Sequence, residues 1–404
     1  MTSFDRTQDL LMSPSPSNFQ PEPGVQKPRR ILVATNHLME IKGSEVVALE
    51  IAQHFASLHD ETTVFANWEA PPMGPLVKAI PGVQVVTDPA LIKPFTFDAV
   101  YAQHQVLGLF DYEQRDDDRY ATRIVMGRLS RRSFMESGGW LHDRLLVDHV
   151  LANSELTLEH LRGIGYSGPI TNFRNAAPES FFHPFRPKPN APRRITVITN
   201  HRDPALLDAI ELLKQVAHVD HMGISGGQVS LVTPDLLVNS DLVISIGKTI
   251  PYALAARVPV YVYDHFGGPG YLDASNFERA ARYNFTGRCC SRTLTAQEIA
   301  AEVIDQYAKG VAFAREMADE MIELFRLPQY LNEIVRPSER SNAEKRKSLA
   351  ENPFIQQERM LASHVRNAYI RERQLEARVK VVTQRLRQVE AKVANATNVG
   401  VKPK

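Results

Sequence analysis

The pattern R-R-I-x-V-x-T-N-H occurs twice in this chain, at positions 29–37 and 193–201. In both copies a basic pair precedes an apolar stretch, and a polar loop and a helical pattern follow. The copies lie 164 residues apart, whereas solenoid repeats have periods of about 20–50 residues. A strand–loop–helix unit repeated at this distance is natural for two similar α/β domains that face each other. The length of 404 residues also exceeds that of one ordinary domain.

The first half of the chain alternates strand and helix patterns. ILVATN is an apolar run typical of a strand buried on both faces, and VVALEIAQHFASL has helical spacing. Further strands are expected at TTVFAN, VQVVT and FDAVYAQ, and a strand entering a helix at VDHVLANSELTLEHLRGIG. This alternation predicts a parallel sheet with helices on both faces. The five prolines of FRNAAPESFFHPFRPKPNAP then mark an interdomain connection.

We therefore expect an α/β protein with two Rossmann-like domains that face each other, followed by a C-terminal coiled-coil helix. The leader is rich in proline and small polar residues and cannot build a packed core. The expected boundaries are a flexible leader at 1–28, an N-terminal domain at 29–187, a C-terminal domain at 188–335, a coiled coil at 340–396 and a tail at 397–404.

The C-terminal region carries a heptad pattern. Spacings of four and three alternate along Leu361, Val365, Ala368, Glu372, Leu375, Val379, Val382, Leu386, Val389 and Val393. Such a seam predicts a homo-oligomer formed through residues 358–396, and its mixture of Val and Leu leaves the strand number open. The alternative is a single amphipathic helix packed on the body.

The distribution of charge along the chain indicates which classes of binding partner to expect. The whole chain has a net charge of +1, which gives no reason to expect a nucleic-acid partner. From Ser338 onward, 15 Lys and Arg stand against 7 Asp and Glu, a net +8. This basic tail is compatible with peripheral contact with an anionic membrane, or it simply keeps the coil soluble.

Composition also suggests a location. No run of about 18 apolar residues and no export signal is present, so we expect a cytoplasmic protein, at most peripheral to the inner membrane. The two cysteines, Cys289 and Cys290, are neighbours and suit neither an ordinary disulfide nor a four-ligand metal site.

Candidate ligand-binding residues lie in the loops that follow the expected strands, where open parallel sheets bind ligands. Gly247 lets the backbone approach an anion, Lys248 supplies a positive charge, and Thr249 suits the cap of a following helix. A tight turn with a solvated lysine is the alternative for this tract. Four such loops, NHLMEIKGSE, YAQHQ, IGKTIPY and YDHFGGPGYL, together predict a phosphate-bearing ligand between the domains.

Other ligands are disfavoured by missing motifs. A Walker A loop is absent around Gly247, and the loop after the first strand offers only Gly43, so we do not expect NAD. The acidic run Asp116–Asp118 is flanked by arginines and is interpreted as a solvated turn. No metal is therefore expected.

Four segments together resemble bacterial GT-B glycosyltransferases of the family 4 type: ILVATNHLMEIKGSEVVALEIAQHFA, FDAVYAQHQ, DHVLANSELTLEHLRGIG with FRNAAPESFF behind it, and SDLVISIGKTIPYALAARVPVYVYD. The resemblance covers about 30–310. It implies an acceptor-binding first domain, a nucleotide-sugar-binding second domain and transfer in the cleft between them. The partners would be a nucleotide-sugar donor and a saccharide, lipid-linked or protein acceptor, with no further cofactor.

The resemblance also assigns site residues. Cations and N–H groups must meet the leaving diphosphate, and Lys248 with His104 are the expected catalytic residues. An imidazole at 104 could take the acceptor's hydroxyl proton or bond a sugar hydroxyl, whereas the alternative is a loop histidine satisfied locally. The expected donor-binding residues are Asn200, His201, Arg202, Gly247, Lys248, Thr249, Tyr252, Asp264, His265, Gly267, Gly268 and Tyr271, and the expected acceptor or cleft residues are Gly43, Ser44, Glu45, Arg174 and Asn175.

One departure from the family pattern keeps other functions open. Family 4 enzymes often carry two glutamates eight positions apart, and here Tyr252 stands where the second is expected. A non-catalytic scaffold of the same fold is therefore one alternative. An NDP-sugar 2-epimerase of related fold is another, although the acidic residues that it needs in the cleft are not evident.

Overall fold

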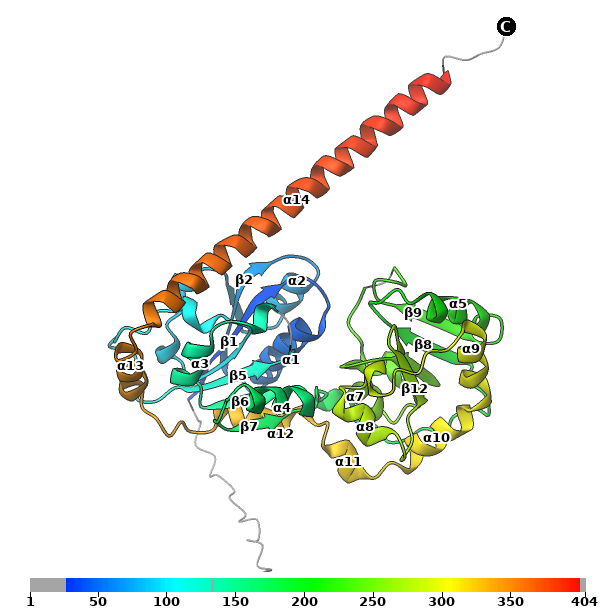
Figure 1. Ribbon diagram of the computed structural model, residues 1–404, viewed down its shortest axis with the longest axis horizontal. Helices are drawn as coiled ribbons and strands as arrows, with labels where there is room; N and C mark the ends of the chain where they lie inside the picture. The colour runs from blue at the N-terminus through cyan, green and yellow to red at the C-terminus, as the bar shows by residue number, and fades with distance from the viewer. Residues whose placement is uncertain (1–26, 132–133, 228, 400–404) are drawn as a thin grey trace, which may run out of the picture.

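The computed structural model describes residues 27–399 except 132–133 and 228, without the side chains beyond 392 (Figure 1). The expected leader at 1–28 thus lies almost entirely outside the described residues. So do residues 400–404 of the expected tail and the side chain of Val393.

A seven-stranded parallel sheet, in the order β3-β2-β1-β4-β5-β6-β7, forms the centre of the first domain. In the interior strand β1 (Arg30–Leu38), Ile31 to Ala34 are fully buried, because helices cover both faces. The strands are β1 (Arg30–Leu38), β2 (Glu61–Glu69), β3 (Val83–Val86), β4 (Ala99–Gln103), β5 (Arg123–Arg128), β6 (His149–Ala152) and β7 (Ile170–Asn172), and the helices are α1 (Gly43–Ser57), α2 (Met73–Lys78), α3 (Trp140–Leu146) and α4 (Glu155–Gly163).

The second domain repeats the scheme with a five-stranded sheet in the order β12-β11-β10-β8-β9, in which only β12 is antiparallel. Its first strand, β8, carries the second copy of the repeated pattern. The strands are β8 (Arg194–Ile198), β9 (His218–Met222), β10 (Leu242–Ser245), β11 (Val260–Asp264) and β12 (Gly267–Tyr271), and the helices are α5 (Pro204–Leu213), α6 (Pro234–Val238), α7 (Thr249–Ala255), α8 (Phe277–Arg282), α9 (Ala296–Asp305), α10 (Tyr307–Glu316) and α11 (Asp319–Glu323).

The tract GGPGY, expected as a loop, is the strand β12. It pairs closely with β11, so that a Cβ added to Gly268 would lie 2.0 Å from the carbonyl oxygen of Val262. Glycine is required here by the approach of another backbone.

The chain crosses between the domains twice, and the two crossings pair with each other. The N–H of Ala177 donates to the carbonyl of Phe325 at 2.7 Å, and the N–H of Leu327 donates to the carbonyl of Ala177 at 2.9 Å. After the second crossing, α12 (Leu327–Val335) buries its apolar stripe in the core of the first domain. The boundaries expected from the sequence place this helix in the second domain, whereas it packs against the first sheet.

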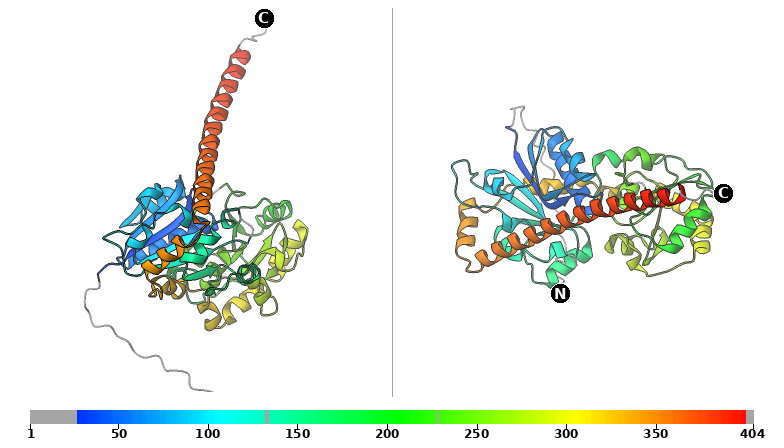
Figure 2. Two further views of the ribbon diagram at one scale, coloured as in Figure 1. Left: turned by 60° about the vertical axis from the view of Figure 1, so that its left-hand side comes forward. Right: turned by 90° about the horizontal axis from the view of Figure 1, so that it is seen from above.

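Two helices follow, α13 (Asn342–Ala350) and α14 (Ile355–Val399). Within the region 340–396 expected to be a coil, α13 packs on the first domain, where buried Lys345 forms an ion pair with Asp148 at 2.6 Å. The start of α14 also lies on the first domain, and the rest of the helix projects away from both domains (Figures 1 and 2). The expected fold class, two facing Rossmann-like domains with a long C-terminal helix, is confirmed. Among the described helices, none is both long and apolar enough to cross a membrane.

Candidate functional site

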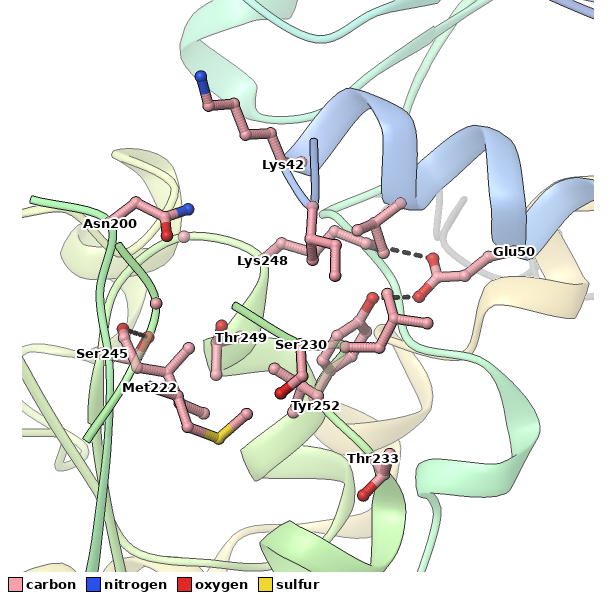
Figure 3. A pocket seen from close by; sticks show the side chains of 18 of the residues that line it. Lys42, Glu50, Asn200, Met222, Ser230, Thr233, Ser245, Lys248, Thr249 and Tyr252 are labelled. Atoms are coloured by element: carbon pink, nitrogen blue, oxygen red, sulfur yellow. Dashed lines mark hydrogen bonds and ion pairs between the residues drawn. The ribbon is translucent and has the colours of Figure 1, made fainter. Parts of the chain in front are cut away.

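A cavity of about 440 Å³ lies between the two domains. The start of α1 forms one wall, and the carboxyl ends of β8, β9 and β10 form the other (Figure 3). Six expected donor-binding residues and one expected cleft residue line it: Asn200, His201, Gly247, Lys248, Thr249, Tyr252 and Gly43. This is the position at which open parallel sheets bind ligands.

Two glycines open onto this cavity from opposite domains. Gly247, in the turn from β10 to α7, has a φ of 62°, a conformation that favours glycine. A Cβ added to Gly247 or to Gly43 would meet nothing within 4 Å, so both backbones are accessible to a ligand. Gly43 is also the first residue of the 15-residue helix α1, whose N-cap residue, Lys42, makes no capping side-chain hydrogen bond. Helix N-termini of this kind attract anions.

Lys248 forms an interdomain ion pair. Its Nζ lies 2.8 Å from Oε2 of Glu50 on α1 and donates to the carbonyl of Ala176 at 3.3 Å (Figure 3). The hydroxyl of Tyr252 donates to the same carboxylate, and the Tyr252 ring stacks on Phe181 with centroids 4.3 Å apart. Burial raises the pKa of Glu50, and the neighbouring Lys248 and Tyr252 oppose that rise. The positive charge of Lys248 is therefore matched by a buried carboxylate.

His104 follows β4 with a φ of 65° and is 2% exposed. Burial, followed by the charges of His37 and Arg128, lowers its pKa to about 3, so the ring is neutral at physiological pH. Its Nδ1 accepts the N–H of Asn36 at 3.2 Å, which places the proton on Nε2. In this tautomer, the ring offers a donor and no free basic nitrogen, so it is poorly suited to take a proton.

His37 lies beside His104, and Glu45 lies beside His37. Oε1 of Glu45 accepts the N–H groups of Met39 and Glu40 at 2.5 and 2.7 Å, and Oε2 lies 3.8 Å from Nε2 of His37. Burial raises the pKa of Glu45 to about 7 and lowers the pKa of His37 to about 4. The Glu45 carboxylate thus organises the loop after β1, close to the ring of His37.

The base of α14 covers this group. The ring of Tyr369 stacks on His37 with centroids 5.8 Å apart, and His37 in turn lies 6.0 Å from His104. Arg366 donates to Oδ1 of Asn67 on β2 at 3.0 Å. The carboxyl edge of β1 and β2 is therefore covered by a helix that follows both strands by about 300 residues in the chain.

The remaining expected residues are placed elsewhere. The amide of Asn175 donates to Asn284 across the domains at 2.7 Å, and the carbonyl of Ser44 accepts from Gln103 at 2.8 Å. Tyr271 donates to the carbonyl of Val303 at 2.6 Å and is part of the core of the second domain. Asp264 is buried and accepts the N–H of Phe266.

The other members of the predicted set do not line the cavity. The ring of His265 lies 4.6 Å from that of His201, and exposed Arg202 follows His201 in the same loop. Arg174 precedes Asn175 with a φ of 54°, and Gly267 and Gly268 serve the pairing of β12. Within the described part of the chain, no group of three or more His, Cys, Asp or Glu side chains is placed to hold a metal ion.

Sequence reasoning missed Glu50, Phe181, His37 and Tyr369. A signal existed for Glu50, because a carboxylate at a position of α1 surrounded by buried Leu49 and Ile51 requires a partner. Tyr369 gave no signal, since its contact with His37 depends on where α14 docks.

No family model matches this chain, and no curated protein matches it. Among solved structures, it is similar to a putative UDP-N-acetylglucosamine 2-epimerase from Listeria monocytogenes, with 12% identity, a TM-score of 0.46, and coverage of 76% of this chain and 95% of that one. It is similar to a glycosyltransferase from Rickettsia africae, with 13% identity, a TM-score of 0.41, and coverage of 80% and 100%. A third similarity, to the glycotransferase of kitacinnamycin, has 10% identity, a TM-score of 0.40, and coverage of 76% and 99%. These scores are too low to assign a function.

Proposed function

We propose that this protein transfers a sugar from a nucleoside-diphosphate sugar to an acceptor hydroxyl, with the donor bound in the interdomain cavity. The observation that carries this proposal is the convergence of two accessible glycine backbones, Gly43 and Gly247, on one cavity at the carboxyl edge of the second sheet.

The proposed roles follow from the charge that develops on the leaving diphosphate. The backbone at Thr249 and the N-terminus of α1 would stabilise that charge, whereas the N–H of Gly247 already donates to the carbonyl of Phe285 at 3.2 Å. Lys248 now forms an ion pair with Glu50, with Nζ and Oε2 2.8 Å apart. A bound diphosphate would compete with Glu50 for this positive charge. We propose no proton transfer to His104, because its Nδ1 is already occupied by a backbone N–H.

The test is nucleotide-sugar binding, measured by calorimetry with UDP-, GDP- and ADP-linked sugars. Gly247→Ala places a methyl group in the cavity, and we expect it to weaken donor binding at least tenfold. The matched control is Gly165→Ala, at a residue after α4 that also has a positive φ (86°) and open space around its Cα. Both substitutions introduce about 1 kcal/mol of backbone strain, but only Gly247→Ala should weaken binding of the nucleotide sugar. Equal binding by both variants would contradict the proposed site.

A second candidate, a non-catalytic scaffold, is favoured by the neutralisation of Lys248 by Glu50. It predicts that none of these nucleotide sugars binds the wild-type protein. Binding followed by release of free nucleotide only when an acceptor is present would instead support transfer.

A further inference from the structure

The long helix α14 presents two different faces to its surroundings. One face contacts the first domain through Glu358, Arg366 and Tyr369. The heptad seam lies on another face. Leu361, Leu375, Val379, Val382, Leu386 and Val389 on that seam are each more than half exposed, with Val382 at 64%. From Leu375 to Val389 the apolar side chains of the seam are therefore exposed, and none of them is buried against the body.

The charges beside the seam are arranged by sign. If Leu375, Val382 and Val389 are taken as heptad d positions, Val379 and Leu386 are a positions. The g positions are then all basic or histidine: His364, Arg371, Arg378, Arg385 and Lys392. The e positions of the projecting part are Glu376, Thr383 and Glu390. Charges at e and g set the partner and orientation of coiled coils.

From this pattern we propose that the seam binds a second copy of this chain, forming a parallel, in-register, two-stranded coil along the projecting part of α14. In a parallel pair, a g residue meets the e residue of the next heptad on the partner. Arg371 then faces Glu376 of the other copy, and Arg385 faces Glu390. An antiparallel pair would instead oppose g with g, bringing arginines together. The charges of the chain thus complement a second copy in one orientation only.

The structure also indicates where the coil begins. Tyr369, at an e position, is buried against the body, and Glu372, at an a position, is paired with Arg373 at 3.1 Å. An apolar interface free of the body therefore starts at Leu375. A parallel pair places both domain bodies, and both interdomain cavities, at the same end of the coil. The assembly does not depend on whether the cavity binds a nucleotide sugar.

The first experiment measures the mass of the full-length protein by sedimentation equilibrium. Val382 and Val381 are adjacent and exposed, but only Val382 lies on the seam. We expect the wild type and Val381→Asp to have twice the chain mass and Val382→Asp to have the mass of one chain. A wild type that is monomeric or larger than a dimer, or an equal effect of both substitutions, would overturn the proposal. Thermal melting of the body should be the same for both variants.

The second experiment tests orientation by charge reversal. Glu376 already pairs with Arg373 of its own helix at 2.7 Å, so Arg385 and Glu390 form the cleaner pair. At low salt we expect Arg385→Glu to weaken dimerisation about tenfold, and the double variant Arg385→Glu with Glu390→Arg to restore it. Arg387→Glu, with the same change of charge off the interface, is the control. An antiparallel coil would instead be strengthened by Arg385→Glu, and that result would refute the parallel arrangement.

Discussion

At the scale of single residues, two ion pairs with little exposure to solvent join elements that are distant in the chain. Glu50 and Lys248 link the two domains at 2.8 Å, and Lys345 and Asp148 link α13 to the first domain at 2.6 Å. A buried ion pair adds little net stability, because desolvation offsets the attraction, but loss of one partner strands the other charge.

The ion pair of Lys248 with Glu50 predicts that Lys248→Met strongly destabilises the folded protein. We expect the variant to lose about 3–5 kcal/mol of unfolding free energy, because Glu50 remains buried without its cation. Adding Glu50→Gln should recover most of the loss, since the Gln amide oxygen can still accept from Tyr252. Urea denaturation of both variants provides the measurement. A single variant as stable as the wild type would show that water reaches Glu50.

Glu45 predicts a pH dependence of stability. Burial raises its pKa from 4.5 to about 7, so between these pH values the folded chain holds a proton that the unfolded chain has released. The contribution of Glu45 to the free energy of unfolding must therefore fall as pH rises from 4.5 to 7, by up to about 3 kcal/mol.

Glu45→Gln should remove this fall while its amide oxygen still accepts from the backbone at Met39 and Glu40. We expect the variant to gain stability over the wild type as pH rises from 5 to 8, measured by denaturation at each pH. A constant difference between the two proteins would mean that Glu45 does not titrate in this range.

At the scale of elements, the first turn of α14 caps α3. The carboxylate of Glu358 accepts the backbone N–H groups of Leu141 and His142, each at 2.9 Å, and also contacts the buried His142 ring. Burial opposes its charge, but these hydrogen bonds hold the pKa of Glu358 below its ordinary value. The backbone N–H groups at the start of α3, which have no partner within their own helix, are thus hydrogen-bonded by a side chain of α14.

We therefore expect Glu358→Ala to loosen the base of α14. The change should cost about 2–3 kcal/mol and increase amide exchange in α3 and in the first turns of α14. Glu351→Ala, at an exposed residue, is the matched control. Unchanged exchange in α3 would show that its first turn finds other acceptors.

At the scale of the whole molecule, the chain returns to the first domain after the second, and α12 packs in the core of the first domain. Leu327, Leu331 and Ile334 are all nearly fully buried in that core, although they follow the entire second domain in sequence. The first domain therefore depends on a segment made after the second.

Leu331→Ala should accordingly weaken the first domain. We expect a loss of about 2–5 kcal/mol, seen as faster amide exchange in β4 and β5 but not in β8 or β10. Leu91→Ala, at an exposed residue of the first domain, removes the same atoms without making a cavity in the core. If Leu331→Ala affected β8 and β10 as strongly, the two domains would unfold as one unit.

Local patterns in the sequence were enough to predict the repeated α/β scheme, because a strand buried on both faces must be apolar throughout. The first strand of each domain and the tract at 247–249 at a strand's carboxyl end follow from such patterns. The same patterns misplaced α12 and treated β12 as a loop, because neither the return of a helix to an earlier sheet nor the close approach of two backbones leaves a local mark.

The sequence by itself determined two Rossmann-like domains, a seam of apolar residues and the charges beside it, since each depends on the spacing of neighbouring residues. Only the tertiary structure decided that Glu50 neutralises Lys248, that α14 covers His37 through Tyr369, and which helix face stays free. Those outcomes depend on how elements far apart in the chain are oriented toward one another, which local spacing does not encode.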